Sequence, residues 1–130
     1  MDELIDIVDV HGLPTGERLL KSDVHHLGAL HRGAHVWIHD THNVLLRRRA
    51  FGKAGGGVWD VAVAGHCRAG EGPLAAGVRE AREELGLQLT ESDLAFLDRR
   101  LLSYGNGCNV IISRYRARLR TEEFSFPDGE

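Results

Sequence analysis

Three glutamates stand close together near the middle of the chain. Glu80, Glu83 and Glu84 occupy positions i, i+3 and i+4, so on a helix their carboxylates share one face. Like charges at these spacings repel, and the helix dipole disfavours anions in the last turns. A divalent cation such as Mg²⁺ or Mn²⁺ takes oxygen ligands and offsets clustered negative charge. The spacing therefore indicates a site for a hard cation; the alternative is a solvated acidic face held by Arg79 and Arg82.

The neighbouring residues predict the helix that carries these glutamates. A sharp turn at residues 70–72 precedes Pro73, which suits the first helical position because its missing N–H would have no partner there. Gly86 is placed to end the helix as a left-handed cap. Four apolar side chains form one stripe at helical spacing and face the core: Leu74, Val78, Ala81 and Leu85. The sequence thus predicts an amphipathic helix from Pro73 to the cap at Gly86.

Residues 65–87 as a whole resemble the signature of the Nudix hydrolase family. In that signature a glycine and a glutamate precede a run of the form R-E-U-x-E-E-x-G-U, where U is apolar. This chain fills every defined position: Gly65, Glu71, Arg79, Glu80, Ala81, Glu83, Glu84, Gly86 and Leu87. The resemblance implies a loop–helix–loop that binds a divalent metal and hydrolyses a nucleoside diphosphate, or another diphosphate, linked to a second group X.

The resemblance also implies roles for single residues. Glu80, Glu83 and Glu84 are expected to hold Mg²⁺ or Mn²⁺. The carbonyl of Ala64 is expected to help, since small residues there let the backbone approach a metal. Glu80 or Glu83 is expected to accept the proton of the attacking water. The remaining positions are expected to support the structure: Gly65, Gly86, and the pair of Glu71 with Arg79 that holds the loop against the helix.

Motifs outside this segment are similar to the Nudix subgroup related to isopentenyl-diphosphate isomerase. The resemblance implies that His25, His31 and His66 correspond to three histidines that hold a metal in the isomerases. They form a candidate second metal site, and the alternative is that they are partly buried polar residues. The matching motifs follow one another between Asp6 and Leu87: residues 6–9, 15–16, 21, 24–25, 31–32, 35–38, 59–60 and 64–66.

The reacting groups of the isomerases are not matched. Ala64 stands where the resemblance would place the catalytic cysteine, and Cys67 lies on the other side of Gly65 and His66. No carboxylate near residues 107–110 supplies the isomerases' two glutamates. We therefore expect a hydrolase. The alternatives are an isomerase that uses Cys67, and a module that binds a nucleotide without turnover.

Several side chains outside the signature are candidates for substrate contacts. Trp37 and Trp59 are expected in the core, with stacking on a nucleobase as the alternative. The basic residues at one strand end and in the glycine-rich loop of residues 50–57 are either solvated or clamp phosphates: Arg47, Arg48, Arg49 and Lys53. Two late glutamates are alternatives for the base: Glu122 and Glu123.

Length and composition limit the class of protein. A chain of 130 residues suggests one domain, and its net charge of −3 gives no support to a nucleic-acid or membrane-surface role. Two cysteines form neither a disulfide framework nor a metal-binding spacing, which is typical of a reduced, cytoplasmic setting. No signal peptide and no membrane span is recognised. The expected partner is a small-molecule diphosphate, and a homodimer is common among such relatives.

The hydrophobic pattern predicts a mixed sheet around the acidic helix, and the resemblance implies a Nudix-like α/β/α sandwich within a single domain of residues 1–130. Residues 1–20 are expected to form an N-terminal hairpin whose turn lies at residues 11–16, and residues 21–32 a loop. The last strand is followed by no recognisable helix, so the family's C-terminal helix is expected to be missing or short. Strands are expected at residues 35–39, 44–46, 58–64, 95–103 and 110–119, and a short strand or an extended link is expected at residues 87–89.

Overall fold

The computed structural model describes residues 3–40, 43–48, 59–103 and 108–118. The predictions for Arg49, Lys53, Glu122, Glu123 and a C-terminal helix lie outside these residues, as do those for the side chains of Arg47, Arg48 and Trp59. The elements are β1 (Leu4–Val8), β2 (Pro14–Leu20), α1 (Lys21–Leu27), β3 (Leu30–His39), β4 (Val44–Arg48), β5 (Trp59–Val61), β6 (Val63–His66), α2 (Pro73–Leu85), η1 (Glu91–Asp93), β7 (Ala95–Ser103) and β8 (Asn109–Arg118).

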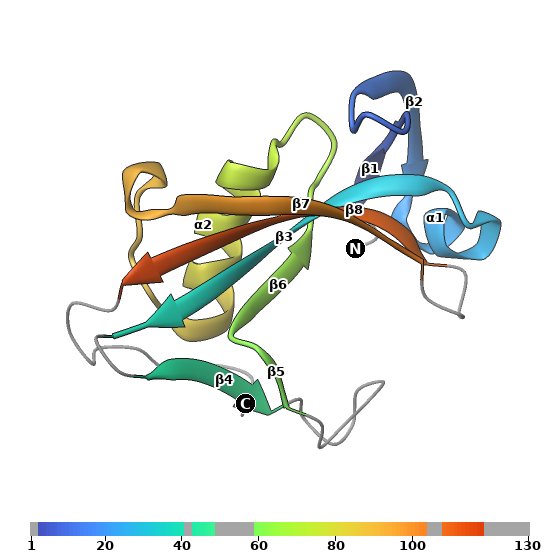
Figure 1. Cartoon of the computed structure of the whole chain (residues 1–130). Coiled ribbons are helices and arrows are strands. Elements are labelled where there is room, and N and C mark those ends of the chain that lie inside the picture. The colour runs from blue at the N-terminus through green and yellow to red at the C-terminus, as the bar shows by residue number, and fades with distance from the viewer. Residues whose placement is uncertain (1–2, 41–42, 49–58, 104–107, 119–130) are drawn as a thin grey trace.

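A mixed sheet forms the centre of the fold (Figure 1). Its strands follow the order β5-β4-β3-β8-β7, and β6 pairs with β3 outside that path. The long strands β3 and β8 are parallel, whereas the other pairs are antiparallel. The predicted mixed α/β class is therefore confirmed. No helix in the described part of the chain is long and apolar enough to cross a membrane.

Helix α2 packs on one face of this sheet. A Cβ added at Gly77 would lie 3.1 Å from Val36 and 3.0 Å from Leu94, so the glycine lets the helix approach the strand closely. Val36 and Ile38 of β3 belong to the same buried core cluster as Leu85 of α2. Helix α2 begins at Pro73 and ends at Gly86, whose φ is 70°, as predicted.

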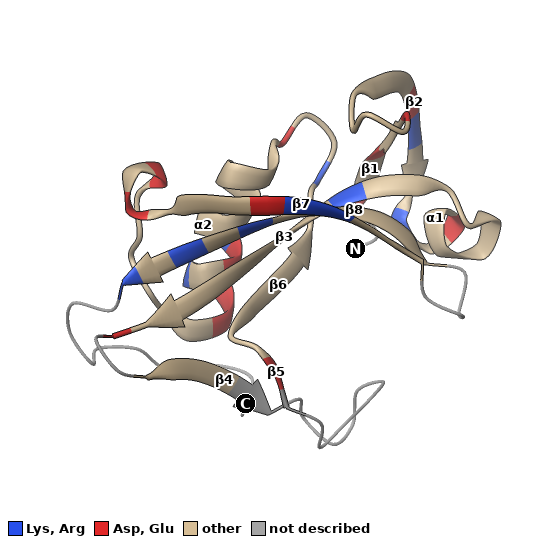
Figure 2. Cartoon of the chain, in the orientation of Figure 1, with Lys and Arg blue, Asp and Glu red and all other residues tan. Residues whose placement is uncertain are grey.

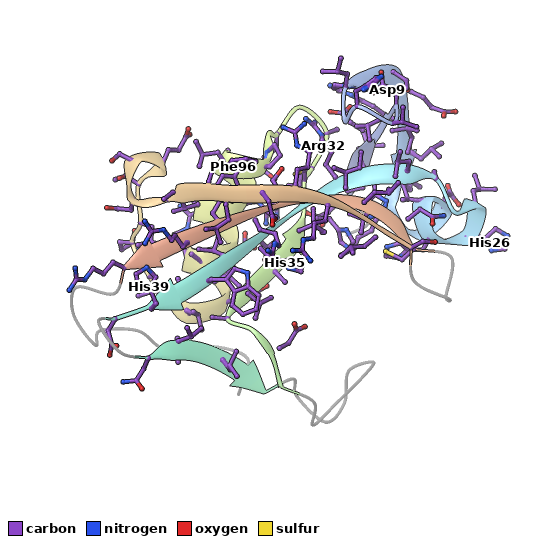
Figure 3. All side chains as sticks on the ribbon, viewed as in Figure 1. Asp9, His26, Arg32, His35, His39 and Phe96 are labelled. Atoms are coloured by element: carbon purple, nitrogen blue, oxygen red, sulfur yellow. The ribbon has the colours of Figure 1, made fainter. Side chains whose placement is uncertain are left out.

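The alternation of β3 sends its other side chains to the opposite face. Figure 3 labels two of them, His35 and His39, along the strand. Trp37 lies between them in sequence and is half-buried; it lines a pocket and is not part of the buried core. The prediction that Trp37 is a core residue is therefore wrong, because its side chain lies on the face of β3 away from α2 and outside the core cluster that α2 covers.

The predicted N-terminal hairpin is present, with its turn displaced toward the N-terminus. Strands β1 and β2 are antiparallel and form a separate two-stranded sheet. The Asp9 carboxylate accepts hydrogen bonds from the backbone N–H groups of His11 and Leu13, at 2.8 and 3.1 Å, and Gly12 has a φ of 81°. Residues 14–16, expected in the turn, already belong to β2.

Two other segments differ from the predictions, and a third agrees with one of its two alternatives. Residues 21–27, expected in a loop, form α1, which buries only Val24 and so leaves no apolar stripe in the sequence. The strand expected at residues 58–64 is two strands, β5 and β6, separated at Ala62. Residues 87–89, expected as a short strand or an extended link, are not a strand but a link, and the N–H of Leu87 donates to the Ala81 carbonyl in the C-terminal cap of α2.

Candidate active site

Gly65 brings α2 against β6. A Cβ at this position would lie 2.4–2.6 Å from the side-chain atoms of Glu80, closer than atoms can approach. Only glycine therefore allows the Glu80 carboxylate to lie against the backbone of β6. Figure 2 shows the acidic positions of α2 beside this strand.

The backbone of β6 presents the carbonyl of Ala64 to the same side. The N–H of Cys67 donates to Arg32 of β3 at 2.9 Å, and the Gly65 oxygen also lies on the β3 side, 2.9 Å from where a Cβ of Gly33 would be. The His66 oxygen instead accepts a hydrogen bond from Nη2 of Arg79 on α2 at 3.0 Å. Because successive carbonyls of a strand point to opposite edges, that of Ala64 points to the edge facing α2.

Arg79 is the buried cation around which the glutamates are arranged. Its Nε and Nη2 donate to the two oxygens of Glu71, each at 2.9 Å, so the expected pair of Glu71 with Arg79 is present. Its Nη1 donates to Glu80 at 2.6 Å and to Glu83 at 3.0 Å. The side chain of Arg79 is only 10% exposed. One guanidinium thus binds three carboxylates and a backbone carbonyl, which fixes the loop before α2 relative to the helix.

These contacts shift the pKa values of both Arg79 and Glu71, and both side chains stay charged. Hydrogen bonding to Glu71 raises the pKa of Arg79 above its usual range, so the guanidinium stays charged. Burial alone would raise the pKa of Glu71, but the bonds from Arg79 and from the Arg68 N–H hold that pKa below its usual range. Glu71 is therefore an ionised structural partner at neutral pH.

The predicted ligands differ in accessibility. The Glu80 side chain is 16% exposed and Glu83 is 43% exposed, while Glu84 is half-buried on the same helix. These carboxylates lie on one face of α2, and the carbonyl of Ala64 on β6 points toward the helix. Such a set of oxygen ligands suits a hard cation. Glu80 and Glu83 meet at Nη1 of Arg79, which already offsets part of their charge.

A second set of ligating groups includes the side chain of His66, the last residue of β6. His25 of α1, His31 of β3 and His66 of β6 have ligand atoms within 4.8 Å of one another, the only such group of three among the described residues. Nε2 of His31 and Nδ1 of His66 are 3.1 Å apart, and Nε2 of His25 is buried without a hydrogen-bond partner. The structure therefore brings together the three histidines that the sequence marked.

Two histidines of the cluster, His31 and His66, have lowered pKa values. Burial, reinforced by the neighbouring charges of His31 and Lys21, lowers the pKa of His66 to about 3, and burial also lowers that of His31. Nδ1 of His31 lies 3.1 Å from the Ala29 carbonyl, which can only accept, so this nitrogen carries the proton and Nε2, which faces Nδ1 of His66, is the unprotonated nitrogen. A neutral imidazole oriented in this way is the form that binds a metal.

Cys67 is not available as a reactive group at either set of ligands. It is 2% exposed and belongs to the core cluster, and burial raises its pKa to about 12. The thiol is therefore protonated and enclosed, unlike a nucleophilic cysteine.

One structural carboxylate had no role assigned from the sequence. Asp6 of β1 is 7% exposed and accepts a hydrogen bond from the N–H of Gly70 at 2.7 Å and one from Nε of Arg18 at 2.9 Å. It thereby ties the N-terminal hairpin to the loop before α2. An aspartate among the apolar residues of a strand is the signal that could have identified it.

Comparison with known proteins defines the class of this protein. Residues 29–130 match the NUDIX domain, and the chain belongs to the Nudix family. It is 38% identical over 91 residues to Nudix hydrolase 3 of Arabidopsis thaliana, covering 68% of this chain and 12% of that protein. It is also 40% identical over 88 residues to isopentenyl-diphosphate Delta-isomerase 2 of Photorhabdus laumondii, covering 66% of this chain and 49% of the isomerase.

The fold has a close match among solved structures. The crystal structure of DR0079 from Deinococcus radiodurans superposes with a TM-score of 0.70 at 21% identity, covering 97% of this chain and 85% of that one. This confirms the Nudix fold expected from the sequence. The chain spans about half the length of the isomerase and a small part of the Arabidopsis hydrolase.

Proposed function

We propose that the chain is a metal-dependent hydrolase that cleaves a diphosphate bond in a nucleoside diphosphate linked to X, or in a similar small-molecule diphosphate. The observation that supports this most directly is the position of Glu80, held by Arg79 against β6 at a site where only glycine fits. This arrangement places carboxylates and the carbonyl edge of β6 on one side of α2.

Each residue of the site has a task in this proposal. Glu80, Glu83, Glu84 and the Ala64 carbonyl would hold Mg²⁺ or Mn²⁺, which when bound polarises phosphoryl oxygens and makes a coordinated water more acidic. Glu83 is the more exposed of the two carboxylates that contact Arg79. It is therefore the better placed to accept the proton of the attacking water, while Glu80 is fixed as a ligand. The ion pair of Arg79 with Glu71 holds the loop before α2 against the helix.

The isomerase alternative is weaker, although isomerases are among the relatives. Ala64 carries no nucleophile, and Cys67 is enclosed in the core as a thiol. A binding module without turnover would not need the complete set of glutamates, which argues against that alternative too. We further propose that the histidine cluster holds a second, borderline cation, because the buried Nε2 of His25 has no other partner.

The experiment that tests the main proposal is phosphate release with Mg²⁺ or Mn²⁺ from nucleoside triphosphates, nucleotide sugars, dinucleotides, CoA and isoprenoid diphosphates. We expect Glu83→Gln to lower the rate by roughly 10²- to 10⁴-fold, the usual contribution of a general base. Glu91→Gln, at an exposed carboxylate outside the site, is the control that should leave the rate unchanged. Isomerised product would support the first alternative, and folded protein that binds nucleotides without turnover would support the second.

A further inference from the structure

A small pocket lies on the sheet face that α2 covers, beside the turn of the N-terminal hairpin. Its volume is about 170 Å³, smaller than the roughly 300–1,000 Å³ typical of sites for organic ligands. A Cβ added at Gly12 of the turn would lie 3.8 Å from Ile111 of β8, so the turn packs against the sheet. The lining includes three basic side chains and, within the described part of the chain, no carboxylate: His11, Leu13, Arg32, Pro73, Arg99 and Ser113.

The register of the sheet brings Arg32 and Arg99 to the same face. Ser113 of β8 lies directly opposite Ala34 of β3, and Arg99 of β7 lies directly opposite Ser113. Ala34 belongs to the core cluster that α2 covers, and Arg32 is two residues before it on β3. Side chains of directly paired residues share a face, so both arginines are on the α2 side. Arg100, which follows Arg99 on β7, is therefore on the other side.

Arg32 is a mostly buried cation whose N–H groups are only partly used. Its side chain is 15% exposed, and Figure 3 labels it between the hairpin that carries Asp9 and the loop before α2. Nη2 donates to the Glu71 carbonyl at 3.3 Å, whereas its distance of 3.7 Å to Asp6 is too long for a hydrogen bond. Nε is buried without a hydrogen-bond partner among the described residues. A buried donor of this kind usually has an acceptor in the native protein, and a bound anion is one such acceptor.

Positive charge exceeds negative charge around the pocket. Asp6, the carboxylate 3.7 Å from Arg32, also accepts a hydrogen bond from Nε of Arg18 at 2.9 Å. Arg99 has no hydrogen-bond or ion-pair partner in the part of the chain that the structure describes. Helix α2 begins at Pro73 with no side-chain cap and no acidic residue in its first turn, so nothing there offsets the positive end of its dipole. An anion would offset this charge, which a water molecule does not.

We propose that this pocket binds a small tetrahedral oxyanion between Arg32 and Arg99, either free phosphate or the phosphate group of a small phosphomonoester. Guanidinium groups match the oxygens of such an anion in geometry and charge. None of the lining residues belongs to the glutamate-bearing signature, so the site is separate from the candidate metal site. The bound anion would join β3 to β7 beside the hairpin turn. Through Arg32, which also donates to the Glu71 carbonyl, it would stabilise the loop before α2.

Calorimetry in EDTA tests the proposal without turnover, because the carboxylates of α2 repel phosphate when no metal is bound. At matched ionic strength we expect saturable binding of sodium phosphate at millimolar or lower concentration. Arg99→Gln should raise the Kd for phosphate roughly 10-fold, the usual effect of losing a hydrogen bond between charged groups. Arg99 is exposed, so this variant should fold with the Tm of the parent. Arg100→Gln is the matched control at the neighbouring exposed arginine of the opposite face, and it should leave the Kd unchanged.

A second titration, with glycerol 3-phosphate, distinguishes the two sources of the anion. If the ester binds as tightly as phosphate or more tightly, and Arg99→Gln weakens its binding, the pocket takes the phosphate group of a metabolite. If phosphate binds more tightly than the ester, the pocket takes the free ion. The inference is overturned if neither anion binds saturably, or if Arg99→Gln leaves both Kd values unchanged, since the anion would then occupy other basic residues.

Discussion

The two sets of ligating residues differ in how the protein satisfies them. On α2 the carboxylates are charged, and Arg79 already contacts Glu71, Glu80 and Glu83. At the meeting point of α1, β3 and β6, burial lowers the pKa values of His31 and His66, and Nε2 of His25 is left buried without a partner. The carboxylates that contact Arg79 therefore already have a hydrogen-bond partner within the protein. The histidine cluster instead leaves a buried nitrogen without a partner, which usually indicates an absent ligand.

The chemistry of the two sets differs as well. Carboxylate and carbonyl oxygens select hard cations such as Mg²⁺ and Mn²⁺, while imidazole nitrogens suit borderline metals such as Zn²⁺ and Co²⁺. Because the nearby stretch of β8 offers no carboxylate, the histidine cluster does not become a mixed oxygen and nitrogen site. The comparison therefore predicts that the two sites respond to different cations and to different ranges of pH.

The largest effect should come from removing the cation that holds the carboxylates. Arg79→Gln leaves Glu71 and Glu80, 17% and 16% exposed, without their guanidinium. Breaking a buried ion pair from one side typically costs about 3–5 kcal/mol, so we expect a decrease of that size in the free energy of unfolding in urea. Arg82→Gln, at an exposed arginine on the same helix, should change it by no more than about 0.5 kcal/mol. An equal decrease in the free energy of unfolding in both variants would mean that the ion pairs of Arg79 contribute no more than those of an exposed arginine.

The histidine cluster should respond to borderline metals alone. At a Co²⁺ concentration of about 100 times Kd, binding to the folded state adds about 2.7 kcal/mol, which is measured as an increase in Tm. His66→Gln should abolish the increase, and His26→Gln, at an exposed histidine next to His25, should keep it. Mg²⁺ at the same concentration should not reproduce the effect of Co²⁺. A Tm increase that survives in the His66 variant would place the Co²⁺ site elsewhere.

The sequence was most informative where one residue type is demanded by local geometry. Pro73 and Gly86 bound α2 as predicted, because a helix start without an N–H and a left-handed cap each favour one residue. The pairing of Arg79 with Glu71 was also expected, since the family signature fixes both positions. The sequence alone could not reveal that Gly65 is needed because Glu80 fills the space of its Cβ, which is a contact between distant elements.

The failures share a physical cause. Helix α1 buries one residue, Val24, so its sequence has no helical period to detect. Trp37 has the hydrophobic character of a core residue, but the alternation of β3 places it opposite Val36, on the face away from α2. Burial depends on which face another element covers, and the alternation of a strand identifies two faces without saying which one is covered.

The smallest predicted effect is a difference between the pH values at which the two regions lose their contribution to folding stability. A histidine whose folded pKa is lowered favours the folded state fully above its unfolded pKa of about 6.5, and this stability is lost as the pH falls below that value. For His66, with a pKa of about 3, the loss at pH 5 is about 2 kcal/mol. Asp6 and Glu71 have lowered pKa values, so their stabilisation is lost only below about pH 4, as the pH falls toward their folded values.

Urea unfolding between pH 7 and pH 4.5 therefore reports on the buried histidines, His31 and His66 of the cluster and His35 of β3, whose pKa burial also lowers. We expect the free energy of unfolding to fall across this range in the parent chain and in His26→Gln, and to fall much less in His66→Gln. Co²⁺ should steepen the dependence, because a metal competes with protons for the same nitrogens. If His66→Gln loses stability between pH 7 and pH 4.5 as steeply as the parent, the acid sensitivity belongs to other groups, and the neutral state assigned to His66 is wrong.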